Sequence, residues 1–291
     1  MIIWLASYPK SGNTWLRALL SSYLYTETGE FDFNILEKID SFPNPKQFSS
    51  YKDKFEKVED TAKYWIKEQE NLNKDKKLKI LKTHNALFKI GNSSFTNNEN
   101  TLGVVYIVRD PRNVITSICN HYQINHEQAL EFMKTQKKAL FSKKQNRFLA
   151  FQPILSWSLN YKSWAENIKY KTLLVKYEDL ENETYITFYK TLKFIKEISN
   201  NNFKINEQKI KKCITSCEFD RLKKLEDKIG FNEAPKIKNS NERLKFFNLG
   251  KKNNWKKILN PEIEKKIRAV FNNEMKELNY LEREKGIEPS A

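Results

Sequence analysis

The first loop of the chain carries a cation and two hydroxyl groups around a glycine, a combination that suits a phosphate ligand. Lys10 and Ser11 precede Gly12, and Thr14 follows it. A glycine-containing turn at the start of a helix presents backbone N–H groups to an anion, and the helix dipole favours negative charge there. The lysine precedes the glycine, so the Gly-Lys-Ser/Thr order that places a hydroxyl on Mg²⁺ is absent. We therefore predict a metal-free phosphate site, although an ordinary strand-to-helix turn with a surface lysine has the same composition.

A second segment pairs a guanidinium group with a hydroxyl. Arg109 follows an apolar run, and Ser117 lies eight residues later, roughly two helical turns away. Ligands bind at the carboxyl ends of strands in open α/β sheets, where a guanidinium fork and a hydroxyl can hold one phosphate. The alternative is structural: Asp110 caps a helix while Arg109 and Arg112 form surface ion pairs.

One histidine has the position of a general base. The chain has three histidines, and His84 follows a short apolar strand and Lys82, whereas His121 and His126 fall on or just beyond a helix. A lone histidine is more often structural than catalytic, but one beside a bound nucleotide can remove a proton from an acceptor.

Apolar runs predict the elements that must position these residues. Buried strands are predicted at residues 2–6, 78–82, 103–108 and 172–176, alternating with helices at 14–25, 58–71, 111 onward and 154–168. We expect residues 26–56 to be irregular and residues 126–150 to be helical. The alternation indicates an α/β fold, a P-loop-like three-layer α/β/α arrangement with a central, mainly parallel sheet. Residues 1–280 are expected to form one domain, followed by a polar tail at 281–291.

Composition limits the remaining functions. The net charge of +16 favours an anionic partner, yet the 52 basic residues are scattered and no nucleic-acid-binding motif accompanies them. No apolar run is long enough to span a membrane, and the N-terminus lacks a signal peptide, which predicts a cytoplasmic protein. Three cysteines without a CxxC pair support neither a disulfide framework nor a metal site.

The loop motif resembles a known family. Residues 8–15, Tyr-Pro-Lys-Ser-Gly-Asn-Thr-Trp, look like the 5′-phosphosulfate loop of the sulfotransferases, usually written YPKSGTTW, with Asn13 as the one change. The resemblance implies that the loop binds the co-substrate 3′-phosphoadenosine 5′-phosphosulfate without a metal. Lys10 would contact the bridging oxygen and 5′-phosphate, and Trp15 would pack near the adenine. The binding residues that this implies are Lys10, Ser11, Gly12, Asn13, Thr14 and Trp15.

Three further segments match the same family in order. Arg109 and Ser117 match its 3′-phosphate motif, and Tyr177 in the segment Leu-Val-Lys-Tyr-Glu-Asp-Leu would lie near the adenine. The Lys-Thr-His run ending at His84 matches the segment whose histidine is the catalytic base. The resemblance implies in-line transfer of a sulfuryl group to a hydroxyl or amine, with His84 removing the acceptor's proton while Lys10 and Lys82 stabilise the leaving oxygen.

The match weakens near the C-terminus. The family has an Arg-Lys-Gly-x-x-Gly-x-Trp loop over the 3′-phosphate, whereas this chain has Asn248 and Leu249 in place of the basic pair and Asn253 in place of the second glycine. We expect Gly250 and the shifted Lys251 and Lys252 to serve this loop.

Several questions stay open at this point. The acceptor, a small molecule or a carbohydrate, would be bound by segments 26–56, 85–100 and 121–155, and the oligomeric state is not predicted. The alternatives are a P-loop-type nucleotide kinase, a basic nucleic-acid-binding protein, and a degenerate sulfotransferase that binds nucleotide without turnover.

Overall fold

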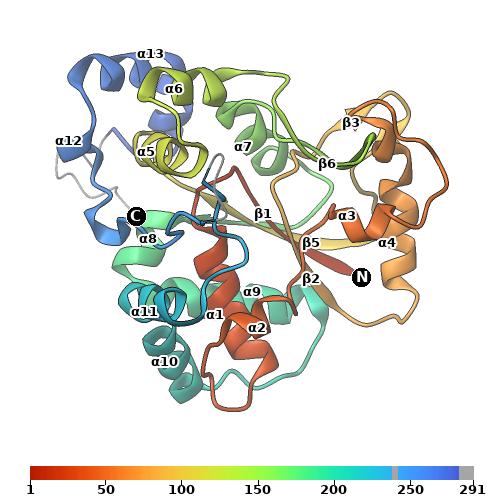
Figure 1. The fold of residues 1–291 in the computed structure, drawn as a ribbon. Helices are drawn as coiled ribbons and strands as arrows, with labels where there is room; N and C mark the ends of the chain where they lie inside the picture. The colour runs from red at the N-terminus through yellow and green to blue at the C-terminus, as the bar shows by residue number, and fades with distance from the viewer. Residues whose placement is uncertain (238–241, 282–291) are drawn as a thin grey trace.

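A four-stranded parallel sheet forms the centre of the computed structural model, which describes residues 1–237 and 242–281 (Figure 1). The strand order is β2-β1-β5-β8, and all three strand pairs are parallel. The strands are β1 (Ile2–Ser7), β2 (Lys79–Thr83), β5 (Thr101–Val108) and β8 (Thr172–Lys176). All four predicted strands are present, so the predicted parallel sheet is confirmed. The predicted tail lies outside the described residues from residue 282 onward.

Helices cover both faces of this sheet. Side chains alternate along β1: Ile3 and Leu5 pack into one apolar cluster, and Trp4 and Ala6 pack into the other. The first cluster is covered by α1 (Asn13–Tyr25), α9 (Thr184–Ser199), α10 (Glu207–Ser216) and α11 (Phe219–Ile229). The second is covered by α5 (Pro111–Tyr122), α6 (His126–Lys134), α7 (Trp157–Ala165) and α13 (Pro261–Glu277). The three-layer prediction is confirmed, and Figure 1 shows the helices on opposite sides of the sheet.

Several shorter elements lie between these strands and helices. They are α2 (Phe33–Leu36), α3 (Pro45–Phe48), η1 (Asp60–Tyr64), α4 (Trp65–Asn73), β3 (Lys89–Ile90), β4 (Ser93–Ser94), α8 (Tyr177–Asn182), η2 (Gly250–Lys252) and α12 (Trp255–Ile258). The helix expected at 58–71 is therefore a 3₁₀ turn followed by α4. Within the described ranges, no helix is both long and apolar enough to cross a membrane.

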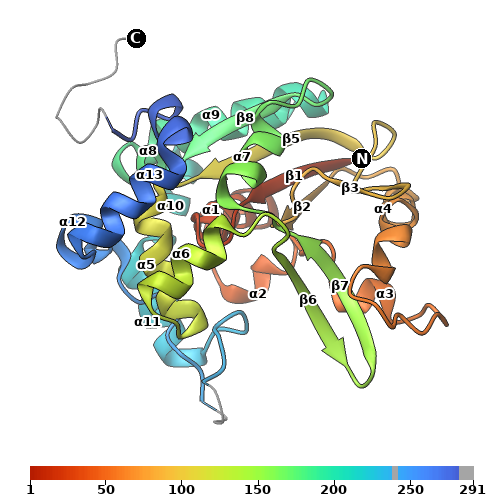
Figure 2. The same cartoon turned by 90° about the horizontal axis from the view of Figure 1, so that it is seen from above.

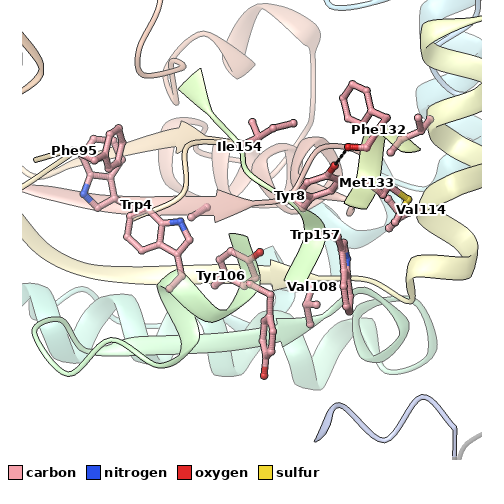
Figure 3. Packing of buried hydrophobic residues seen from close by; sticks show 14 of the residues in the cluster. Trp4, Tyr8, Phe95, Tyr106, Val108, Val114, Phe132, Met133, Ile154 and Trp157 are labelled. Carbon is pink, nitrogen blue, oxygen red and sulfur yellow. Dashed lines mark hydrogen bonds between the residues drawn. The ribbon is translucent and has the colours of Figure 1, made fainter. Parts of the chain in front are cut away.

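Aromatic side chains fill the core on the Trp4 face of the sheet (Figure 3). The Trp4 ring lies 4.9 Å from that of Phe95 and 5.6 Å from that of Phe42, and its indole N–H donates to Thr101 at 2.9 Å. Full burial of such a side chain stabilises the fold by roughly 1.5–3 kcal/mol. The hydrogen bond to Thr101 offsets the cost of burying the indole N–H group.

The helical prediction for residues 126–150 is wrong beyond Lys134. Instead of continuing the helix, the chain forms the antiparallel hairpin of β6 (Ala139–Lys144) and β7 (Arg147–Pro153), which extends from one side of the molecule in Figure 2. Distant contacts account for the difference: the Phe148 N–H donates to the carbonyl of Phe55 at 2.9 Å, and Phe151 stacks on Trp65. Such tertiary pairing overrides local propensity.

Arg112 anchors the start of α5, the helix that follows Arg109. Asp110 caps the helix by accepting from the Arg112 N–H at 2.9 Å, as the structural alternative expects. The Arg112 side chain is buried, binds the Asp110 carboxylate at 2.7 Å, donates to the carbonyl of Tyr280 at 3.0 Å and lies on the Trp255 ring. This interior pairing ties α5 to the C-terminal elements, so it is not the surface ion pair that was considered.

We predict that Arg112→Met lowers the free energy of unfolding by about 3–5 kcal/mol, because it leaves the buried Asp110 carboxylate without its counter-charge. Lys193→Met is the control, since Lys193 pairs with Glu197 on the exposed surface, and we expect a change within about 0.5 kcal/mol. Urea denaturation followed by circular dichroism measures both. Equal stability of the two variants would contradict the anchoring role.

Candidate active site

The predicted site residues gather at the carboxyl ends of the four strands. The loop of residues 8–12 follows β1, His84 follows β2, Arg109 follows β5 and Tyr177 follows β8. Since the strands are parallel, these ends lie at one edge of the sheet. The topology therefore brings together residues that are widely separated in the sequence.

The turn after β1 is shaped by a close approach that only glycine allows. Gly12 has a φ of +97°, and a Cβ there would lie 2.9 Å from Cε2 of Tyr177 and would overlap the ring. Lys10 also has a positive φ of 68°. Helix α1 begins at Asn13, directly after Gly12, so the turn presents the helix N-terminus at the sheet edge.

One buried hydroxyl in this turn fits the phosphate that was predicted. Ser11 Oγ has no hydrogen-bond partner among the residues that the structure describes. Asn13 Oδ1 lacks one too, but an amide oxygen only accepts, so it offers no bond to a phosphate. Ser11 is fully buried, so its hydroxyl needs a bound partner to offset its desolvation. The Asn13 amide nitrogen instead donates to the carbonyl of Leu5 at 2.9 Å and to Ser7 at 3.1 Å, which ties α1 to β1. The side chain of Thr14 is buried at the same helix start.

Arg109 and Ser117 lie side by side, as their spacing predicted. Arg109 Nη1 is 3.5 Å from Ser117 Oγ and 3.4 Å from the carbonyl oxygen of Lys10. The guanidinium also lies 3.9 Å from the centre of the Tyr177 ring, and its Nε has no partner within the described chain. A buried guanidinium with an unused N–H is suited to a second phosphate.

Two aromatic rings border this site. Trp15 and Tyr177 lie with their ring centres 5.8 Å apart, and the Trp15 indole N–H donates to the carbonyl of Cys217 at 3.0 Å. Both rings were expected near the adenine, and the structure places them next to each other beside the turn.

Lys10 lies in a crowded cationic environment. Burial, together with the charges of Lys82 and Arg109, lowers its pKa to about 7. Its Nζ lies over the Phe246 ring at 4.1 Å and 3.4 Å from Nδ1 of His121. Burial and the charges of Lys10 and Lys82 lower the pKa of His121 to about 4, so His121 stays neutral beside Lys10. A bound dianion would relieve the repulsion among these cations.

The hydrogen bond of His84 fixes its tautomer. Nδ1 lies 2.9 Å from the carbonyl oxygen of Ser7, which can only accept, so Nδ1 carries the proton and Nε2 keeps its lone pair. Burial and the nearby Lys82 charge lower the pKa of His84 to about 3. The imidazole is therefore neutral near pH 7, with Nε2 unprotonated.

Lys82 is held by an ion-pair cluster that the sequence did not reveal. Its Nζ lies 3.0 Å from Glu233, which also binds Arg17. Burial would raise the pKa of Glu233, but the charges of Lys82 and Arg17 outweigh burial and hold the pKa at about 2. No local signal could have found Glu233, because it lies 151 residues from Lys82 in the sequence.

A cavity of about 760 Å³ opens beside this cluster. Its lining includes Glu233 and comes from residues 40–46, from the hairpin β6–β7 and from Asn232. Two of the three segments that were expected to bind the acceptor, 26–56 and 121–155, therefore meet here. Among the described residues, no group of three or more His, Cys, Asp or Glu side chains could hold a metal ion.

The C-terminal loop reaches the site through Asn253, which replaces the second glycine of the family's loop. Asn253 is buried and donates to Ser117 Oγ at 3.1 Å. Gly250 has a φ of +52°, and a Cβ there would lie 2.7 Å from the ring of Phe219. Lys252 is exposed, and the side chain of Lys251 lies outside the part that the structure describes.

Known proteins support the same interpretation. A model of the sulfotransferase domain matches residues 2–279. Flavonol 3-sulfotransferase of Flaveria bidentis is 26% identical over 285 residues, covering 94% of this chain and 81% of the relative. Cytosolic sulfotransferase 16 of Arabidopsis thaliana is 27% identical over 287 residues, covering 95% and 76%.

A solved structure has the same fold. The mouse sulfotransferase SULT7A1, complexed with PAP, superposes with a TM-score of 0.58 at 18% identity, covering 94% of this chain and 84% of that one. The family match spans nearly the whole chain and includes every strand of the sheet. The chain therefore belongs to the sulfotransferase family, and it transfers a sulfuryl group from 3′-phosphoadenosine 5′-phosphosulfate.

Proposed function

We propose that the turn after β1 binds the 5′-phosphosulfate of the donor and that the acceptor, a small molecule with a hydroxyl or amine, enters through the 760 Å³ cavity. The observation that carries the proposal is the buried Ser11 hydroxyl without a partner, beside Lys10 at the start of α1. An anion at this position would satisfy the hydroxyl, the backbone N–H groups and the helix dipole together.

The remaining donor contacts follow from the same edge of the sheet. Arg109 and Ser117 would hold the 3′-phosphate, because the guanidinium has an unused N–H and the two side chains already meet. Trp15 and Tyr177 would contact the adenine, since both rings border the turn. When bound, the donor supplies the sulfuryl group and a bisphosphate leaving group.

His84 and Lys10 would carry the chemistry. The Nε2 lone pair of His84 would accept the proton of the attacking hydroxyl or amine, and the Ser7 carbonyl would hold the imidazole in that tautomer. Lys10 would stabilise negative charge on the leaving oxygen. The charge of Lys82 is shared with Glu233, so we assign Lys82 a supporting electrostatic role beside Lys10.

The cavity lining suits a polar acceptor with some apolar surface. It combines the carboxylates of Asp40 and Glu233 with Lys46, Gln152 and the ring of Phe141. A named relative acts on flavonols, and a phenolic acceptor of that kind fits such a mixed lining; a carbohydrate remains the second candidate.

A kinase is not favoured, because the loop lacks the Walker A order. The cytoplasm remains our proposal for its location.

We predict that His84→Gln lowers kcat by about 10²–10⁴-fold while donor affinity changes little, because the glutamine keeps a hydrogen bond to Ser7 but cannot accept the proton. Transfer from ³⁵S-labelled donor to a panel of phenols, amines and sugars measures the rate. His126→Gln is the matched control and should keep the parent rate. An unaffected His84→Gln enzyme would remove His84 as the base.

We predict that kcat/KM for the donor falls as pH rises through about 7, because this parameter reports the free enzyme, in which Lys10 loses its proton near that pH. The charged form that binds the anion exists below the pKa, so the decrease lies on the alkaline side. Lys10→Arg, which stays protonated, should lack this limb even if its rate is lower. A limb that persists in Lys10→Arg would assign it to another group.

We predict that Ser142→Trp raises the acceptor KM at least about tenfold and leaves the donor Kd unchanged, because Ser142 lines the cavity and an indole would fill part of it. Lys144→Trp is the control, since Lys144 lies on the same strand, is exposed and does not line the cavity. Steady-state kinetics with the best acceptor of the panel distinguish the two. An unchanged acceptor KM in Ser142→Trp would place the acceptor elsewhere.

A further inference from the structure

Asn253 stands where the related loop has a glycine, and its side chain is inserted against α5 rather than exposed. The residue is 8% exposed. Its amide nitrogen lies 3.0 Å from the carbonyl oxygen of Asn113 and 3.1 Å from Ser117 Oγ, and its Oδ1 accepts a hydrogen bond from Thr116. A glycine at this position could make none of these contacts.

The carbonyl of Asn113 settles which end of the amide faces Ser117. A carbonyl oxygen can only accept a hydrogen bond, so the amide atom 3.0 Å from it must be the nitrogen. The same nitrogen lies 3.1 Å from Ser117 Oγ, so Ser117 receives an N–H there. Ser117 therefore accepts from Asn253 at this contact.

Arg109 presents a second donor to the same hydroxyl. Its guanidinium has no acceptor atom, so the 3.5 Å contact from Nη1 to Ser117 Oγ can only be a donation to the serine. Because N–H groups face both lone pairs of the Ser117 oxygen, its proton must point away from Asn253 and Arg109. Within residues 1–237 and 242–281, no acceptor bonded to that proton is found.

We infer that Asn253 is a positioning residue for the 3′-phosphate: together with Arg109 it forces Ser117 to act as a hydrogen-bond donor toward the bound anion. The inference rests on the proposed function, which places the 3′-phosphate at Arg109 and Ser117. A serine hydroxyl can otherwise donate or accept, and an anion requires a donor. Accepting two hydrogen bonds also polarises the hydroxyl and strengthens its own donation.

This arrangement accounts for the altered C-terminal loop. The basic pair of the related loop is absent, and Lys252, two residues after Gly250, is exposed. Recognition of the 3′-phosphate then combines Arg109 with a neutral amide that acts through Ser117, and the bond from Thr116 holds that amide in place.

The test compares Kd values for 3′-phosphoadenosine 5′-phosphate and AMP, which differ only in the 3′-phosphate, by calorimetry in EDTA. The parent enzyme should prefer the bisphosphate by roughly 10²-fold, since two hydrogen bonds to a charged group are each worth about tenfold or more. Asn253→Ala should reduce this preference about tenfold and leave AMP binding unchanged. Asn253→Asp should nearly abolish it, because a carboxylate accepts from Ser117 and repels the phosphate.

Two further variants separate positioning from a merely structural role. In a Ser117→Ala background, Asn253→Ala should cause no additional loss of preference, because the residue acts through the serine. Asn254→Ala is the matched control: its side chain caps α12 by accepting from the Lys256 N–H, so the preference should be unchanged. Equal weakening of both nucleotides by Asn253→Ala, or a further loss of preference in the Ser117→Ala background, would overturn the inference. A parent enzyme without preference would overturn the 3′-phosphate assignment itself, which is a different result.

Discussion

The contact between Tyr177 and Gly12 is the constraint on which the site depends. The end of β8 places the Tyr177 ring so close to the turn after β1 that a side chain at Gly12 would overlap it. The same ring lies against Trp15 and under the guanidinium of Arg109, which comes from the end of β5. One aromatic ring therefore sets the relative positions of three strand ends, and with them the groups that we propose to bind the phosphates.

Cationic side chains define the electrostatics of this site. Lys10, Lys82 and Arg109 lie close enough for their charges and burial to lower the pKa of Lys10 to about 7. Glu233 compensates part of this charge at Lys82, and the neutral His121 accepts from Lys10. In the proposed function, a bound polyanion would relieve this repulsion, and the binding energy of the donor would act where negative charge develops during transfer. The neutral, tautomer-fixed His84 completes this arrangement at the end of β2.

Local patterns predicted the sheet and the turn after β1, because a buried strand and a glycine-containing turn are both encoded by neighbouring residues. Apolar runs gave the four strands, and the residue order around Gly12 indicated the turn. Long-range contacts were not predictable: the hairpin at β6–β7 depends on pairing with Phe55, and the role of Glu233 depends on its contact with Lys82. Asn253 shows the same limit. In the sequence it only replaces a glycine of the family's loop, and its contact with Ser117 is visible only in the structure.

A crystal structure with 3′-phosphoadenosine 5′-phosphate, grown without added metal, tests the central claim most directly. The account predicts the 5′-phosphate at the start of α1, within hydrogen-bond distance (about 2.7–3.2 Å) of Ser11 Oγ and the turn N–H groups. The 3′-phosphate should contact Arg109 and Ser117, with Asn253 still donating to the serine. A nucleotide bound with its 3′-phosphate in solvent, or with Ser11 still lacking a partner, would contradict the assignment of this edge of the sheet as the donor site.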